Sequence, residues 1–210
     1  ILLQSPTVYG ALHGLQTLLQ LLEFGWLDDS ATAQQKGLPT YLIRDTPLKI
    51  IDAPLYPFRG LMIDTARHYV PLDLILTNLD VMAMNKMNVL HWHVTDSQSW
   101  PYESTSFPEL SAKGAYCKDC VYRQEDVTLV IKEASIRGIR VIPEFDLPGQ
   151  SQAVGASHPE LLTAGGDAGP TEPLDVTERA VYRFLYILYV EIASMWPDQW
   201  MHIGGDEVSL

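Results

Sequence analysis

The second part of the chain alternates between short apolar runs and longer segments with helical periodicity. The apolar runs predict buried β-strands at residues 58–66, 88–94, 139–146 and 199–205. The helical spacing predicts helices at residues 71–86, 125–138 and 178–196, with Pro71 in the first turn of the first, Gly138 closing the second and Pro197 stopping the third. This alternation indicates parallel βα units whose sheet is covered on both faces.

The first part of the chain has a different pattern. Apolar residues recur with a helical period over residues 5–23, which predicts one helix that Gly25 and the polar residues after it bring to an end. A short β-like run at residues 48–52 precedes two prolines. We therefore predict two regions: residues 1–53 as the C-terminal part of a small α+β domain with its linker, and residues 54–210 as the βα domain.

The composition supports folded domains and narrows the classes of partner. The chain has 210 residues, of which 47% are hydrophobic and 19% are charged, enough to bury a sizeable core. Its formal net charge of -12 argues against nucleic acid as a partner, because a phosphate backbone requires clustered Lys and Arg. No apolar run is long enough to cross a bilayer, and the first residues do not have the pattern of a signal peptide.

Both cysteines, Cys117 and Cys120, lie in the sequence CKDC. A CxxC pair can be half of a zinc site, a redox pair or a small loop disulfide. Zinc would need further ligands at a suitable spacing, and the chain has no other cysteine. A loop disulfide or two free thiols is the favoured interpretation, and a disulfide would point to an oxidising compartment.

Polar side chains lie at the ends of all four predicted strands. They are Asp64, Arg67 and His68 for the first, His91, His93 and Asp96 for the second, Glu144 and Asp146 for the third, and Asp206 and Glu207 for the fourth. A (β/α)8 barrel collects its active site from the carboxyl ends of many strands. A doubly wound nucleotide-binding sheet would have a glycine-rich turn after its first strand, and residues 64–71 contain no glycine. The pattern therefore favours an α/β fold of the (β/α)8 TIM-barrel type.

The histidines and acids leave more than one chemistry open. His91 and His93 lie on one face of a strand and could chelate a divalent metal, as in a metal-dependent hydrolase. Buried histidines on a strand are more often hydrogen-bonding core groups, so we predict no metal. Asp206 and Glu207 are neighbours on an extended chain and point to opposite sides, so they can act on one substrate in two different roles.

Several segments carry a resemblance to one family. HIGGDE at residues 202–207 is joined by FRGLMIDTARHYVP, MNKMNVLHWHVTDSQSWP, RGIRVIPEFDLPG and WPDQWMHIGGDEV. Together they resemble, in the same order, segments of the family-20 glycoside hydrolases, the β-N-acetylhexosaminidases. The helix TVYGALHGLQTLLQLL resembles the end of the small domain that precedes the family's barrel. Essentially the whole chain is covered, and the resemblance is greatest to the lysosomal-type eukaryotic members.

The resemblance implies a reaction and a set of site residues. The family removes terminal N-acetylglucosamine or N-acetylgalactosamine with retention, and the sugar's own 2-acetamido oxygen is the nucleophile. Glu207 matches the general acid/base, and Asp206 matches the carboxylate that orients the acetamido group. Arg59 matches the arginine that binds the far hydroxyls of the sugar. The supporting residues implied by the resemblance are Asp96, Glu144, Asp146, Gln150 and His93.

One position departs from the family pattern. Family members usually have a histidine where this chain has Gln150, paired with the acid that Asp96 matches and linked to the catalytic glutamate. Glutamine forms hydrogen bonds but cannot titrate. We therefore expect an active but slower enzyme in which Gln150→His raises turnover. The alternatives are that Gln150 replaces one hydrogen bond by another, or that the protein is a non-catalytic homologue that binds glycans or has a structural role.

The resemblance also implies the wider setting. Substrate-assisted hydrolysis needs no cofactor, and the expected partner is a glycan or glycoconjugate with a terminal N-acetylhexosamine. A homodimer and a lysosomal or extracellular location are expected from the family. Because the sequence ends shortly after Glu207, we expect about the first four βα units of the barrel. Such a fragment is expected to be inactive and to aggregate through its open sheet edge.

Overall fold

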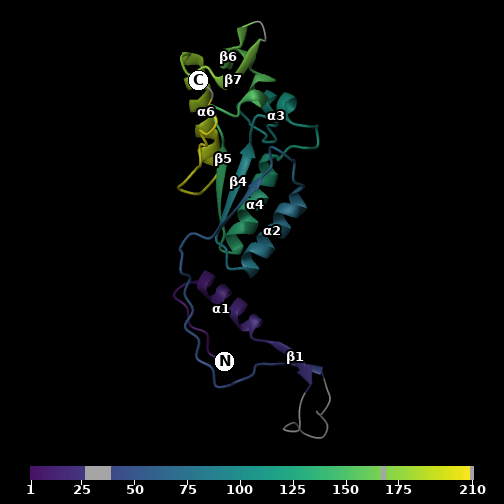
Figure 1. Cartoon of the computed structure of the whole chain (residues 1–210), viewed down its shortest axis with the longest axis vertical. Coiled ribbons are helices and arrows are strands. Elements are labelled where there is room, and N and C mark those ends of the chain that lie inside the picture. Colours follow the sequence, from purple (N-terminus) through teal and green to yellow (C-terminus); the bar gives the residue numbers. More distant parts are fainter. Residues whose placement is uncertain (27–38, 167–168, 209–210) are drawn as a thin grey trace. The chain divides into compact units, whose positions relative to one another are not determined.

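The computed structural model describes residues 1–26, 39–166 and 169–208. The chain divides into two compact units, Ile1–Pro57 and Phe58–Leu210 (Figure 1). No helix in the described ranges is both long and apolar enough to span a membrane. The second unit contains every candidate site residue that the sequence predicts.

The first unit contains one helix and a two-stranded antiparallel sheet. Helix α1 spans Val8–Gln20, and the side chain of Thr7 caps it by accepting a hydrogen bond from the backbone N–H of Gly10. Strands β1 (Glu23–Trp26) and β2 (Pro39–Leu42) pair with each other. The structure therefore confirms the predicted helix and adds a sheet that the short apolar runs did not indicate.

The strand predicted at residues 48–52 is wrong. These residues have no regular secondary structure. A strand depends on backbone hydrogen bonds to a neighbouring strand, and the sheets formed by the described residues contain no strand that pairs with them. The apolar character of the run was therefore not enough to make it a strand.

The second unit is built on a parallel sheet in which the strand order follows the sequence, β3-β4-β5. Strand β3 spans Gly60–Asp64, β4 spans Val89–Thr95 and β5 spans Arg140–Phe145. Helix α2 (Leu72–Met84) connects the first two strands, α4 (Gln124–Ile136) connects the next two, and α6 (Arg179–Met195) follows β5. Helices α2 and α4 lie side by side next to the strands (Figure 1). These elements agree with the predicted βα units.

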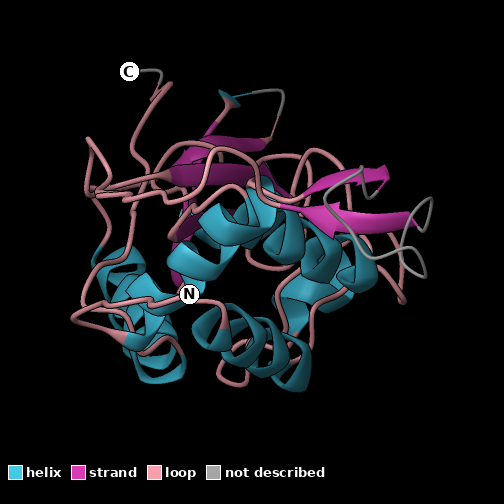
Figure 2. Ribbon diagram, turned by 90° about the horizontal axis from the view of Figure 1, so that it is seen from below, coloured by secondary structure: helices cyan, strands magenta, loops and turns pink. Residues whose placement is uncertain are grey.

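Shorter elements, which the sequence pattern did not predict, lie in the connections. They are α3 (Glu109–Gly114), α5 (Gln152–Gly155), the 3₁₀ helix η1 (Pro159–Leu161), and the antiparallel strands β6 (Leu162–Ala164) and β7 (Pro170–Leu174). Figure 2 shows the helices in cyan, the strands in magenta and the loops in pink. Each of these elements is too short to give a periodic signal.

The two faces of the parallel sheet differ in chemistry because successive strand residues point to opposite sides. On β4, Leu90, Trp92 and Val94 are fully buried in a core that includes apolar residues of α2, α4 and α6. The alternate residues of β4 are His91 and His93. The helices therefore cover an apolar face, and the opposite face carries polar groups.

Two predictions about the strands need correction. Strand β3 was predicted to be buried, but Met62 is 54% exposed, because β3 is an edge strand and Met62 shares the polar face in register with His91. The predicted fourth strand, residues 199–205, forms only one parallel bridge, from His202 to Glu144. The chain then turns away at Gly204 and Gly205, which have φ angles of 67° and 106°. This segment still lies next to β5 in the order that the sequence predicted.

The structure decides the state of the cysteines. Cys117 and Cys120 form a disulfide in the polar loop between α3 and α4. Of the two favoured interpretations, the loop disulfide is confirmed.

Candidate active site

A row of polar residues crosses the sheet face opposite the helices. Asp64 of β3 pairs in register with His93 of β4, and His93 pairs with Glu144 of β5. Glu144 in turn forms the parallel bridge with His202. Residues paired in this way point to the same face of a sheet, so the register places two acids and two imidazoles side by side.

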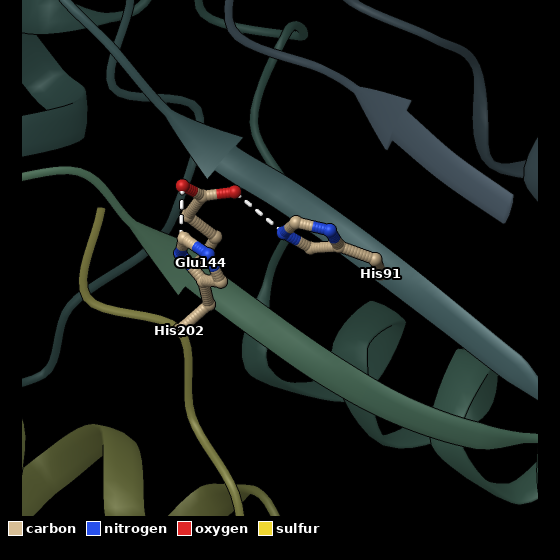
Figure 3. A group of neighbouring side chains, drawn as sticks. All are labelled: His91, Glu144 and His202. Carbon is tan, nitrogen blue, oxygen red and sulfur yellow. Dashed lines mark hydrogen bonds and ion pairs between the residues drawn. The ribbon is translucent and has the colours of Figure 1, made fainter. Parts of the chain in front are cut away.

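Glu144 is surrounded by three histidines. Its Oε2 atom lies 2.5 Å from His91 Nε2 and 3.0 Å from His93 Nδ1, and its Oε1 atom lies 2.9 Å from His202 Nδ1. Figure 3 shows His91 and His202 on either side of the Glu144 carboxylate. Burial alone would raise the pKa of Glu144, but the hydrogen bonds from His91 and His93 outweigh it and hold the pKa well below its usual range. Glu144 is therefore a fixed anion under the site.

His93 lies between two buried acids. Its Nε2 atom is 2.9 Å from Asp96 Oδ2, and its Nδ1 atom faces Glu144. Burial lowers the pKa of the imidazole, but the hydrogen bonds to Asp96 and Glu144 outweigh that effect and raise the pKa to about 9. Both ring nitrogens therefore donate, and His93 is a cation that orients Asp96.

Arg67 makes a second contact with the same carboxylate. Its Nη1 atom lies 2.9 Å from Asp96 Oδ2 and 2.9 Å from Asp64 Oδ2. The Asp64 Oδ1 atom also accepts the backbone N–H groups of Ala66 and Arg67, which fixes the turn after β3. Because the Arg67 side chain is 39% exposed, the guanidinium is held by the protein and still faces outward.

Asp146 and Asp206 form an acid pair one step further along the site. Asp146 is buried directly after β5, and its Oδ1 atom accepts the backbone N–H of Gly205 at 2.7 Å. Its Oδ2 atom has no hydrogen-bond partner among the described residues. Burial and the neighbouring Asp206 raise the pKa of Asp146 to about 6, against the effect of the Gly205 N–H. The pair can therefore hold one proton near neutral pH.

The position of Gly204, next to the Asp146 carboxylate, requires a glycine. A Cβ atom on Gly204 would lie 1.9 Å from Asp146 Oδ1, and Gly204 also has a left-handed φ of 67°. A side chain at this position would displace Asp146 from the Gly205 N–H. The two glycines before Asp206 therefore have a physical reason in the structure.

Glu207 points toward Gln150. The Gln150 Nε2 atom donates to Glu207 Oε2 at 2.5 Å, and the Ser97 hydroxyl donates to Gln150 Oε1 at 3.0 Å. Ser97 also donates its backbone N–H to Asp96 Oδ1 at 2.7 Å. Gln150 thus links Glu207 to the segment that carries Asp96, at the same end of the sheet.

The structure brings most of the predicted site residues together. Asp206 turns toward Asp146 while its neighbour Glu207 turns toward Gln150, as the prediction of two different roles requires. Asp96, Glu144 and His93 form the connected network beneath them. These residues come from the ends of β4 and β5 and from the segment next to β5.

Arg59 does not lie with this group. It precedes β3 at its amino end, and its Nε atom donates to the backbone oxygen of Lys86 in the connection that leads into β4. An entire strand separates its backbone position from the turn after β3, and its role in binding the sugar stays a prediction. Arg67 is the arginine at that end of the sheet.

Three residues of the network were missed as site residues. Arg67 was named among the polar side chains at the end of the first predicted strand, but it was given no role in the site. Ser97 and Glu172 gave no comparable signal: Ser97 is one serine in a polar loop, and Glu172 lies in the unpredicted strand β7. Glu172 enters the site only because the chain folds back and its Oε2 atom accepts the Ser97 hydroxyl.

Some of these groups have the donor set for a divalent cation. His91, Glu144 and His202 offer ligand atoms that lie within 4.8 Å of one another, and the same holds for Glu144, Asp146 and Asp206. Two imidazoles and a carboxylate suit Zn²⁺. In the first group the carboxylate of Glu144 also accepts hydrogen bonds from both histidines, so this group can serve either as a metal site or as a hydrogen-bonded network.

Comparisons with known proteins identify the family of the chain. Residues 56–210 match the catalytic domain of glycosyl hydrolase family 20. The chain is 45% identical over 210 residues to the beta-hexosaminidase subunit beta of Mus musculus, and 45% identical over 215 residues to the subunit alpha of Rattus norvegicus. These alignments cover 98% and 99% of this chain, and 37% and 38% of the two relatives.

Solved structures give the same result. The Flavobacterium johnsoniae chitobiase matches with a TM-score of 0.76 and 36% identity over 94% of this chain and 29% of that one. The family 20 exo beta-N-acetylglucosaminidase of Vibrio harveyi, in complex with N-acetylglucosamine, matches with a TM-score of 0.75 and 30% identity over 95% and 33%.

The matched family and structures give the chain a fold of the TIM-barrel type. The chain belongs to glycosyl hydrolase family 20. It spans somewhat more than a third of the length of the curated relatives given above.

Proposed function

We propose that the protein is a β-N-acetylhexosaminidase. It releases terminal non-reducing N-acetylglucosamine or N-acetylgalactosamine from β-linked glycans by a substrate-assisted, retaining mechanism. The observation that carries the proposal is that the two neighbouring acids face different partners: Asp206 lies beside Asp146, and Glu207 lies beside Gln150. The names of the matched relatives, which are hexosaminidases and an N-acetylglucosaminidase, support it.

Glu207 is the proposed general acid and base. Its proton goes to the glycosidic oxygen as the bond to the leaving group breaks, and the acetamido oxygen of the same sugar forms a bond to the anomeric carbon. Glu207 then takes a proton from water, whose oxygen replaces the acetamido oxygen and completes retention. The Glu207 side chain is exposed, so it can reach a substrate above the sheet end.

Asp206 is the proposed partner of the acetamido group. An acetamide that attacks its own sugar ring gains positive charge, and its N–H group donates a stronger hydrogen bond to a carboxylate. Asp206 is exposed, and its carboxylate lies within 4.8 Å of that of Asp146, whose raised pKa of about 6 lets the pair carry one proton. A carboxylate with a protonated neighbour is oriented, and it keeps the charge that stabilises the oxazolinium ion.

Arg67 is a second proposed sugar-binding arginine, besides the Arg59 that the family resemblance implies. Two carboxylates hold its guanidinium, and a rigid fork of donors suits two neighbouring hydroxyls of a sugar. The buried cation His93 and the anion Glu144 support this arrangement from below by fixing Asp96.

The wider setting of the protein is also proposed from its family. Residues 1–53 are the proposed end of a small α+β domain, and residues 54–210 are the proposed first four βα units of the catalytic barrel. A homodimer, a glycan or glycoconjugate substrate, and a lysosomal or extracellular location fit this assignment. The disulfide between Cys117 and Cys120 supports an oxidising compartment.

An assay with an aryl N-acetyl-β-glucosaminide and the matching galactosaminide tests the proposal. Glu207→Gln and Asp206→Asn are each expected to lower kcat by about 100-fold or more, the usual contribution of a general acid/base or a charge-stabilising group. Glu160→Gln is the matched control, since Glu160 is exposed and pairs only with His158 in the network described here.

A second function is favoured by one observation, the neutral Gln150 beside the acid. A protein that hydrolyses neither substrate but binds N-acetylglucosamine, with binding lost in Asp206→Asn, would be a glycan-binding homologue. If Glu207→Gln leaves turnover unchanged, Glu207 is neither the general acid nor the general base.

A further inference from the structure

Glu207 is the first member of a polar chain that leads away from the site and ends at a second carboxylate. We define this polar chain as Glu207, Gln150, Ser97 and Glu172. Gln150 Nε2 lies 2.5 Å from Glu207, Ser97 Oγ lies 3.0 Å from Gln150 Oε1, and Ser97 Oγ also contacts Glu172 Oε2. Nothing in the sequence pattern singled out Ser97 or Glu172.

Glu172 is held firmly at the far end of the polar chain. Its Oε2 atom also accepts the backbone N–H of Ser151 at 2.9 Å and of Gln152 at 3.1 Å. Both residues directly follow Gln150, so the carboxylate fixes the backbone on which Gln150 sits. Gln150 itself has a φ of 44°, a left-handed conformation that such contacts help to maintain.

Ser97 cannot satisfy both of its neighbours at once. A hydroxyl has one proton to donate, and Ser97 Oγ faces two acceptors, Gln150 Oε1 and Glu172 Oε2. A hydrogen bond to an ionised carboxylate is roughly twice as strong as one to a neutral amide. The proton of Ser97 therefore goes preferentially to Glu172, which leaves the Gln150 carbonyl facing an oxygen that is not donating.

A half-turn of the Gln150 amide removes this conflict. The –NH₂ group then donates to Ser97 Oγ, and the carbonyl faces Glu207. In this orientation the amide accepts a hydrogen bond from protonated Glu207, whereas in the opposite orientation it donates one to ionised Glu207. The two orientations therefore match the two protonation states that the acid and base steps require.

We propose that Gln150 is a rotating amide that offers its carbonyl to Glu207 in the acid step and its –NH₂ group in the base step, and that Glu172, acting through Ser97, favours the first orientation. Gln150 and Glu172 are positioning residues, since neither gives up or takes a proton. Glutamine thereby serves both halves of the cycle without titrating. This inference rests on the proposed function of Glu207.

The substitution Glu172→Gln tests whether Glu172 favours the orientation in which the Gln150 carbonyl faces Glu207. The oxygen of the new side chain can still accept the N–H groups of Ser151 and Gln152, but it no longer carries the charge that draws the Ser97 proton. Ser97 then donates to the Gln150 carbonyl, so the –NH₂ group of Gln150 is held toward Glu207. That arrangement suits ionised Glu207 and opposes the acid step.

The readout is the dependence of kcat/KM on the leaving group. A dinitrophenyl glycoside departs with little protonation, whereas an alkyl glycoside or a disaccharide depends on the acid. Glu172→Gln is expected to lower kcat/KM for the poor leaving group by about 10-fold, and for the dinitrophenyl substrate by no more than about 2-fold, because only the first reaction depends on general acid catalysis. Gln150→Met, which has neither donor nor acceptor, should show the same selectivity.

The controls separate this inference from simple damage to the fold and from the proposed function. Glu160→Gln should leave kcat/KM unchanged for both substrates. Circular dichroism and thermal unfolding of Glu172→Gln should match those of the unsubstituted protein. An equal loss for both substrates, or no loss, would overturn the inference while leaving the hydrolase assignment intact. Absence of turnover of either substrate by the unsubstituted protein would instead overturn the proposed function.

Discussion

The Nη1 atom of Arg67 lies 2.9 Å from the Oδ2 atom of Asp96, whose side chain is completely buried. His93 Nε2 approaches the same oxygen at 2.9 Å, so one carboxylate oxygen receives two cationic donors. Asp96 lies after β4 and Arg67 lies after β3, so this contact joins two strand ends that are far apart in the sequence. The contact fixes the only arginine that the described residues place within this acid network.

Arg67→Gln should therefore affect stability and activity together. It removes charged hydrogen bonds to Asp64 and Asp96, which typically contribute about 2 kcal/mol to the free energy of unfolding. KM should also rise if the guanidinium binds sugar hydroxyls. Urea unfolding and steady-state kinetics measure the two effects. Arg59→Gln is the matched variant at the other end of β3. A larger rise of KM in Arg59→Gln than in Arg67→Gln would identify Arg59 as the sugar-binding residue.

The cation His93 should make stability depend on pH. Its pKa of about 9 in the folded protein is above the usual 6.5, so its contribution is fully present below pH 6.5 and is lost as the pH rises through 9. His93→Gln should therefore destabilise the protein most at pH 6, by about 3 kcal/mol at most, and much less at pH 9. Urea unfolding at these two values measures the difference, and a difference that does not change with pH would contradict a protonated His93.

The acid pair should show the same direction of dependence over a lower pH range. The pKa of Asp146 is raised to about 6 from the usual 3.8, so the folded protein holds this proton more tightly than the unfolded chain. The free energy of unfolding should accordingly fall as the pH rises from about 4 to 6 and then level off. Asp146→Asn should flatten this part of the profile. An unchanged slope in thermal unfolding over this range would show that Asp146 does not hold the proton.

Removal of divalent metal should leave turnover unchanged. In the proposed mechanism the acetamido group supplies the nucleophile and Glu207 supplies the proton, so no step requires a metal. Dialysis against a chelator, followed by the aryl glycoside assay, measures this. Activity that is lost on dialysis and returns with Zn²⁺ would favour the metal-dependent hydrolase instead. In that case Zn²⁺ should not restore activity to His91→Gln.

The sequence determined the βα units of the second part of the chain. The helices at α2, α4 and α6 and the strands at β4 and β5 follow from periodicity and from apolar runs, because long segments that bury one face must repeat their pattern. The strand ends also identified Asp96, Glu144, Asp146, Asp206 and Glu207, since parallel strands bring their carboxyl ends to one edge. The prediction of a strand at residues 48–52 was wrong because the local sequence does not show whether a neighbouring strand is available for pairing.

Only the tertiary structure decided which of these side chains touch. The parallel register placed Asp64, His93 and Glu144 in one row, and register depends on how the strands pack rather than on any one strand. The chain fold also brought Glu172 from an unpredicted hairpin to Ser97, and it placed Arg67 rather than Arg59 beside Asp96. A sequence gives each residue its chemistry, but hydrogen bonds and ion pairs require separations of about 3 Å, and distances of this size between remote residues arise only when the chain has folded.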